Sequence, residues 1–131
     1  MDKIDKQIRA FQQGELDAVL LYRGLSDRMK AEEDQELLKK VAAEEGRHAA
    51  VCRGLTCETL EATSGLKNGI ILLYRLLGKK LTFRLLSIGE KSAGKKYDKF
   101  IQKYDINEFV SVAEDEYEHG RLFLNAAKNK K

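Results

Sequence analysis

The chain reads EEGRH at residues 44–48 and DEYEH at residues 115–119. Each segment ends in a histidine that follows a glutamate by three residues, and these are the only histidines of the chain. Side chains three apart on a helix face the same side, so a carboxylate and an imidazole in this spacing can reach one metal ion together. One such pair is a weak signal, because helices are rich in glutamate. Two pairs that use every histidine make a stronger one: Glu45 with His48, and Glu116 with His119.

The sequence around both motifs predicts long helices. The chain of 131 residues has no proline and is rich in lysine, glutamate, leucine and alanine, which favour helices. Asp105 with Glu108 resembles a capping box, which predicts a helix start at Asp105. Gly78 predicts a break between a short apolar helix and the long helix after it. The predicted helices cover approximately residues 2–30, 34–55, 66–77, 80–104 and 105–128.

A repeat of alternating four- and three-residue steps marks the buried face of each long helix. In the first helix the repeat passes through Ile8, Phe11, Glu15, Ala18 and Tyr22, so a glutamate lies in the middle of an apolar stripe. The other three long helices have the same pattern, apolar at both ends and ionisable at the centre. Burying unpaired charges is costly, and a bound cation would offset that cost. The central residues of the other stripes are Glu45 with His48, Glu90, and Glu116 with His119.

The spacing of these glutamates places them at matching levels. Glu15 and Glu45 are equally distant from residue 30, and Glu90 and Glu116 are equally distant from residue 103, so each helical hairpin sets its two glutamates side by side. The long connection before the third long helix has room for a crossover that contains the short helix. We therefore predict an all-α fold, a ferritin-like four-helix bundle with one long crossover, in a single domain over residues 1–131.

The donor inventory matches that of carboxylate-bridged di-metal bundles. Glu15 and Glu90 each contribute one carboxylate, and the two Glu-x-x-His pairs contribute the rest. Four carboxylates balance two divalent cations, and oxygen donors with two imidazoles suit iron or manganese. We expect two iron ions, with manganese as the alternative. The competing interpretation is a helical bundle with an incidental polar layer.

Two tyrosines and four glycines accompany the predicted ligands. Tyr22 and Tyr97 lie two turns beyond Glu15 and Glu90, where they could hydrogen-bond ligands or carry an electron. The alternative is that both are ordinary core residues. The glycines indicate close helix packing or room for ligand movement, with chance placement as the alternative. They are Gly14, Gly46, Gly89 and Gly120.

Composition excludes several functional classes. The net charge of +3, from 24 basic and 21 acidic residues, gives no reason to expect nucleic-acid binding. Two cysteines are too few for a zinc or rubredoxin site. The start of the chain has no secretory signal, so we expect a cytoplasmic protein. The apolar segment of residues 69–77 is amphipathic, which permits membrane-surface contact. We instead expect a packed connecting helix and no membrane contact.

Several segments resemble the rubrerythrin family. They are ELDAVLLY at residues 15–22 together with EEGRH and DEYEH, while LTFRLLSIGEKSAGKKY at residues 81–97 is similar to the rubrerythrin-like domain of vacuolar-iron-transporter-type proteins. The resemblance implies a non-haem di-iron centre in a ferritin-like bundle, usually in a homodimer or larger homo-oligomer. The ligands that it implies are Glu15, Glu45, His48, Glu90, Glu116 and His119.

The chain departs from that family in two respects. It has no rubredoxin domain, so electrons would come from a separate donor. Ser87 and Ala93 occupy the positions one turn from Glu90, where rubrerythrins have an extra carboxylate tied to peroxide reduction. The first hypothesis is an oxidoreductase that reacts with oxygen or hydrogen peroxide, as a ferroxidase or peroxide scavenger. A non-catalytic module for iron binding, sensing or storage is second, and a metal-free interaction module is third.

Overall fold

A computed structural model describes residues 2–129, and it is built from helices. The described residues contain no strand, so the predicted all-α fold class is confirmed. The elements in chain order are α1 (Lys3–Ser26), α2 (Glu32–Thr56), α3 (Gly65–Leu77), α4 (Lys79–Tyr104), the 3-10 helix η1 (Asn107–Phe109) and α5 (Val110–Lys128).

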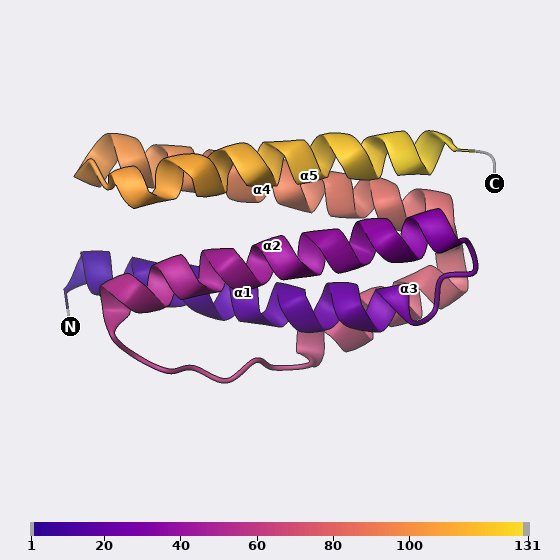
Figure 1. The fold of residues 1–131 in the computed structure, drawn as a ribbon, viewed down its shortest axis with the longest axis horizontal. Coiled ribbons are helices and arrows are strands. Elements are labelled where there is room, and N and C mark those ends of the chain that lie inside the picture. The colour runs from indigo at the N-terminus through magenta and orange to yellow at the C-terminus, as the bar shows by residue number, and fades with distance from the viewer. Residues whose placement is uncertain (1, 130–131) are drawn as a thin grey trace. The chain divides into compact units, whose positions relative to one another are not determined.

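The chain divides into two compact units, Met1–Leu72 and Leu73–Lys131. The first unit contains α1 and α2, which run antiparallel to each other, and the second contains α4 and α5 in the same arrangement (Figure 1). Helix α3 crosses the boundary between the units. These two pairs supply the four long helices that a ferritin-like fold requires.

The turn between α1 and α2 begins earlier than predicted. Helix α1 ends at Ser26 rather than near Lys30, because side chains from both sides close the turn. The Ser26 hydroxyl donates to the carbonyl of Gln35, and the Gln35 amide donates to the carbonyl of Met29. Met29 is buried. Because side-chain contacts rather than a glycine or proline form this turn, the local sequence does not predict where it begins.

The connection after α2 runs back along α1. Gln12 donates to the carbonyl of Glu58, and Gln13 donates to the carbonyl of Glu61. Asp17 then accepts from the backbone N–H of Thr63. The partners on α1 therefore advance along that helix as the connection advances toward α3. This course agrees with the predicted crossover that contains a short helix.

Helix α3 is less buried than a packed connecting helix should be. Ile71 is its only buried residue. Gly78 separates it from α4 with a φ of 85°, as the predicted break requires. The expectation that this segment packs against the fold is therefore wrong for most of its side chains. Four of its leucines are exposed instead: Leu66, Leu72, Leu76 and Leu77.

The predicted capping box at Asp105 is also wrong. Asp105 ends α4 instead, with a φ of 55° and its N–H bonded to the carbonyl of Ile101. Aspartate tolerates this left-handed conformation better than most residues. Glu108 falls in η1, and α5 begins only at Val110.

Among residues 2–129, no helix is long and apolar enough to cross a membrane.

Candidate metal centre

The first half of the predicted site lies between α1 and α2. Glu15 comes from α1, while Glu45 and His48 come from adjacent turns of α2, and all three are at most 5% exposed. The His48 Nδ1 atom lies 2.7 Å from a Glu15 carboxylate oxygen and 3.0 Å from a Glu45 carboxylate oxygen. Two carboxylates therefore converge on one imidazole nitrogen inside this helix pair.

The second half repeats this arrangement between α4 and α5. The His119 Nδ1 atom lies 3.5 Å from a Glu90 carboxylate oxygen and 3.4 Å from a Glu116 carboxylate oxygen. All three residues are buried. Each helix pair thus brings together the three donors that its own sequence stripes predict.

Aromatic packing lies on both sides of the second half-site along the helices. Phe83 stacks on Phe123 before Glu90 in α4, with ring centroids 5.8 Å apart. Beyond the glutamate, Tyr97 and Phe100 pack against Phe109, with centroids 5.1 Å and 5.8 Å apart. These packed aromatic layers lie on either side of the polar donors and bury them from water.

The donor sets have the chemistry and spacing for metal binding. Two ligands that each lie about 2.1 Å from an ion, at right angles, are about 3 Å apart. The imidazole-to-carboxylate distances of 2.7–3.5 Å in the two half-sites bracket that value. The ligand atoms of Glu15, Glu45 and His48 also lie within 4.8 Å of one another, as do those in the second half-site. A cation at each set would offset the cost of burying its carboxylates.

One of the flanking glycines is required by close helix packing. A Cβ atom at Gly120 would lie 2.8 Å from a Lys91 side-chain carbon and 3.2 Å from the Ser87 carbonyl oxygen. The Ser87 hydroxyl donates to the Gly120 carbonyl at 2.6 Å, which holds α4 against α5 beside His119. Nothing among the described residues lies within 4 Å of a Cβ built at Gly14 or Gly89. Close packing therefore explains Gly120 and neither of these two.

The two predicted tyrosines are both buried. Tyr22 is in α1 and Tyr97 is in α4, each two turns from its predicted glutamate ligand. The Tyr97 ring packs against Phe109, as a core tyrosine does. Their assignment to hydrogen bonding or electron transfer stays a prediction.

The sequence pattern assigns no role to Tyr117, which lies beside Glu116. Its hydroxyl donates to an Asp98 carboxylate oxygen at 2.8 Å, and this hydrogen bond raises the pKa of Tyr117. A Cβ at Gly94 would lie only 3.0 Å from the Tyr117 ring, so the ring covers this glycine closely. The contact joins α4 to α5 next to a predicted ligand. Its only signal in the sequence is its place inside the DEYEH motif.

Comparison with known proteins identifies the family. A family model described as "Ubiquinone biosynthesis protein COQ7" matches residues 2–131. This is a ferritin-like di-iron carboxylate family, so the match supports the predicted superfamily and the predicted iron cofactor, but it names a family other than rubrerythrin. Searches of curated proteins and of solved structures gave no match. The chain therefore belongs to the COQ7 family of ubiquinone biosynthesis proteins, whose cofactor is a pair of iron ions.

Proposed function

We propose that the two half-sites come together as one di-iron centre that hydroxylates a quinone-type ring with molecular oxygen. The observation that carries the proposal is the family match over residues 2–131 in a chain that retains all six predicted donors. The COQ7 family consists of di-iron hydroxylases of ubiquinone biosynthesis. Glu45 and Glu116 would bridge the two ions, and Glu15 and Glu90 would each bind one ion terminally.

The reaction requires two electrons from outside the protein. One oxygen atom enters a ring C–H bond as a hydroxyl group, and the other leaves as water after taking up two electrons and two protons. A bound di-iron pair supplies the oxygen activation in this scheme. The chain itself would hold the two ions with the carboxylates and imidazoles of both helix pairs, and would exclude water by burying all six donors.

Peroxide scavenging, as in rubrerythrins, fits the chain less well. The extra carboxylate associated with peroxide reduction is replaced by Ser87 in one direction along α4 and by Ala93 in the other. Ser87 is buried and its hydroxyl donates to the Gly120 carbonyl, so it takes part in a contact between α4 and α5. Iron(II) oxidation as the main reaction stays an alternative, which the following experiment separates from hydroxylation.

The test is a single turnover with isotopically labelled oxygen gas. Iron(II)-loaded protein is mixed with a ubiquinone precursor that has an unsubstituted ring position and a short isoprenoid tail. Mass spectrometry should find one labelled oxygen atom in the ring of the product. Glu116→Ala should abolish incorporation, because it removes a bridging ligand. The matched control is Glu118→Ala, an exposed glutamate two residues along that pairs with Arg121, and it should retain full incorporation.

Two results would contradict this function. Rapid iron(II) oxidation without label in the ring would indicate a ferroxidase. Faster consumption of hydrogen peroxide than of oxygen, again without ring label, would indicate a peroxide-reducing enzyme.

A further inference from the structure

Tyr117 makes two contacts with α4 from a position between two predicted ligands. It lies in α5 directly after Glu116 and two residues before His119. Its hydroxyl donates to an Asp98 carboxylate oxygen at 2.8 Å. Its ring lies over Gly94, where a Cβ would be 3.0–3.1 Å from three ring carbons. The glycine thus gives the ring room against α4, and the hydrogen bond fixes the direction in which the ring points.

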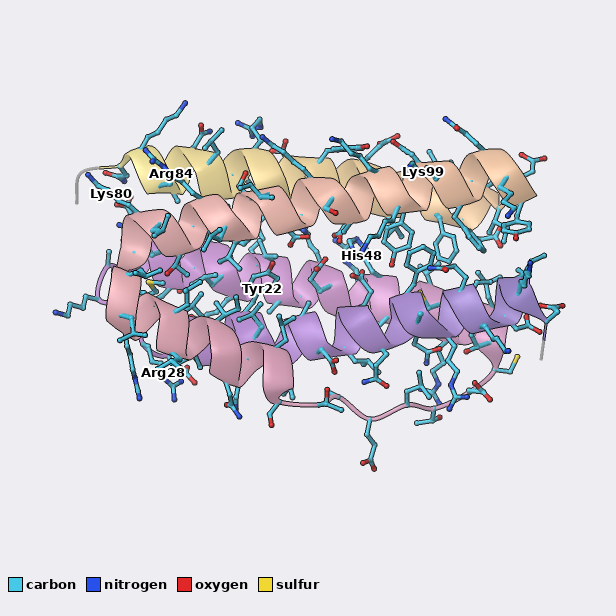
Figure 2. All side chains as sticks on the ribbon, turned by 180° about the vertical axis from the view of Figure 1, so that it is seen from behind. Tyr22, Arg28, His48, Lys80, Arg84 and Lys99 are labelled. Atoms are coloured by element: carbon cyan, nitrogen blue, oxygen red, sulfur yellow. The ribbon has the colours of Figure 1, made fainter. Side chains whose placement is uncertain are left out.

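The acceptor of this hydrogen bond stands out on α4. The helix is rich in lysine, and its cations Lys80 and Lys99 are exposed (Figure 2). Asp98 is the only acidic residue of α4 besides Glu90. A hydrogen bond to a charged acceptor is stronger than one between neutral groups. The single acidic side chain that α4 has outside the metal site therefore bonds across to α5.

A second hydrogen bond joins the same two helices on the other side of Glu90. The Ser87 hydroxyl donates to the Gly120 carbonyl at 2.6 Å, and this contact is buried. Ser87 is about one turn before Glu90 along α4, whereas Gly94 is about one turn after it. The two contacts between α4 and α5 therefore lie on either side of the ligand glutamate of α4.

Apolar contact alone does not fix how two packed helices lie along each other. Apolar burial has no direction, and packed helices can shift by about 1–2 Å. The His119 Nδ1 atom lies 3.5 Å from a carboxylate oxygen of Glu90, which comes from the other helix of the pair. A shift of α5 along α4 changes this distance directly. Because ligands must be held within about 0.5 Å of their working geometry, a directional contact between these helices bears on metal binding.

We propose that Tyr117 is a positioning residue of the metal centre, which acts through its hydrogen bond to Asp98. The bond holds α5 in register with α4 and so keeps Glu116 and His119 opposite Glu90. The phenol does not bind an ion in this role. The inference rests on the proposed metal centre, because it concerns the same donors. The competing interpretation is that the bond stabilises the helix pair without affecting the ligands.

Cobalt(II) binding to the metal-free chain tests this role without turnover. Cobalt(II) accepts the same oxygen and nitrogen donors as iron(II), and its visible absorption reports binding. Tyr117→Phe keeps the ring over Gly94 and removes only the hydroxyl. It should weaken cobalt(II) binding roughly tenfold, the lower end of the effect of changing a residue behind a metal ligand. The matched control is Tyr104→Phe at the end of α4, whose ring packs on Phe100 and which should bind as the parent does.

Variants that keep one half-site separate positioning from a general loss of stability. E45A/H48A keeps the complete donor set between α4 and α5, and E116A/H119A keeps the complete set between α1 and α2. Tyr117→Phe should weaken cobalt(II) binding in the first background and leave it unchanged in the second. Circular dichroism checks that each variant is folded. Equal weakening in both backgrounds, or in neither, would overturn the proposal.

The hydrogen bond itself is tested by a double-mutant cycle in the otherwise unchanged chain. Asp98→Asn keeps an acceptor oxygen and should bind cobalt(II) nearly as the parent does, whereas Asp98→Ala should weaken binding as much as Tyr117→Phe. Y117F/D98A should bind no more weakly than either single variant, because all three lack the same bond. Additive losses would overturn the proposal. Both positions are half-buried, so the cycle stands even where a half-site variant does not fold.

The parent chain distinguishes two kinds of failure. A parent that bound no cobalt(II) would contradict the metal centre itself, and the role of Tyr117 with it. A parent that binds cobalt(II), with a Tyr117→Phe variant that binds equally well, would contradict the positioning role alone.

Discussion

At the scale of single residues, each helix pair gathers two carboxylates around one imidazole nitrogen. In the first pair Glu15 and Glu45 are 2.7 Å and 3.0 Å from His48, and all three are buried. One imidazole can offset at most one negative charge, so burying both carboxylates as anions costs free energy unless a cation is bound beside them. The residues that suit the chain to binding iron therefore reduce its stability without iron.

Replacing Glu45 with glutamine should separate these two effects. Without metal, Glu45→Gln should leave the free energy of unfolding unchanged or raise it by about 1–2 kcal/mol, because a neutral amide of the same shape replaces a crowded carboxylate. Iron(II) should stabilise the parent by about 3 kcal/mol when it exceeds its Kd about a hundredfold, but should not stabilise the variant. Denaturant unfolding with and without iron measures both quantities.

Glu44→Gln is the matched control for this change. Glu44 is the neighbouring glutamate and pairs with Arg47 at the surface, at 3.3 Å. It should unfold like the parent under both conditions, because surface ion pairs contribute little. If iron stabilised Glu45→Gln as strongly as the parent, Glu45 would not be a ligand.

At the scale of helices, the sequence predicted the interiors well and the turns poorly. The seam repeat placed Glu90 and Glu116 at one level, and the fold brings both within 3.5 Å of the same imidazole. Such periodicity follows from helix geometry alone. The end of α1 at Ser26 depends on contacts with Gln35 across the turn, and a local pattern does not contain them. Asp105 is ambiguous in sequence, since aspartate favours helix starts and also tolerates the left-handed conformation that ends α4.

Two glycines of the second helix pair should respond oppositely to alanine. Gly120→Ala should lower the free energy of unfolding by about 1–3 kcal/mol, because its Cβ would press on Lys91 and on the backbone at Ser87. Gly89→Ala should raise it by up to about 1 kcal/mol, because the site is open and alanine favours helix. Thermal and denaturant unfolding of the metal-free proteins measures both.

Iron content distinguishes the two explanations for glycines beside the ligands, which are close helix packing and room for the ligands to move. Gly120→Ala should also bind iron more weakly, because the residue follows His119 directly. Gly89→Ala should bind iron normally if its placement beside Glu90 is incidental. Loss of iron from Gly89→Ala despite increased stability would show instead that the ligands need room to move.

At the scale of the whole molecule, the sequence pattern predicted the fold class and the family match identified the family. Pattern alone predicted the six donors, and the match over residues 2–131 supports a di-iron, ferritin-like protein. The pattern did not predict the family, because the Glu-x-x-His framework is common to ferritin-like di-iron proteins. The single-domain organisation and the homodimer or larger assembly stay predictions. The exposure of the α3 leucines became visible only in the structure, since the same apolar residues would also suit a buried connecting helix.

The central claim is that the half-sites at His48 and His119 form one di-iron centre. Mössbauer spectroscopy and magnetic susceptibility of the iron-loaded, oxidised protein test it most directly. We predict two iron ions per chain with antiferromagnetic coupling, because bridging carboxylates would connect the ions, and we predict that Glu116→Ala loses the coupling. Two magnetically isolated ferric ions, or a single ion per chain, would contradict the claim.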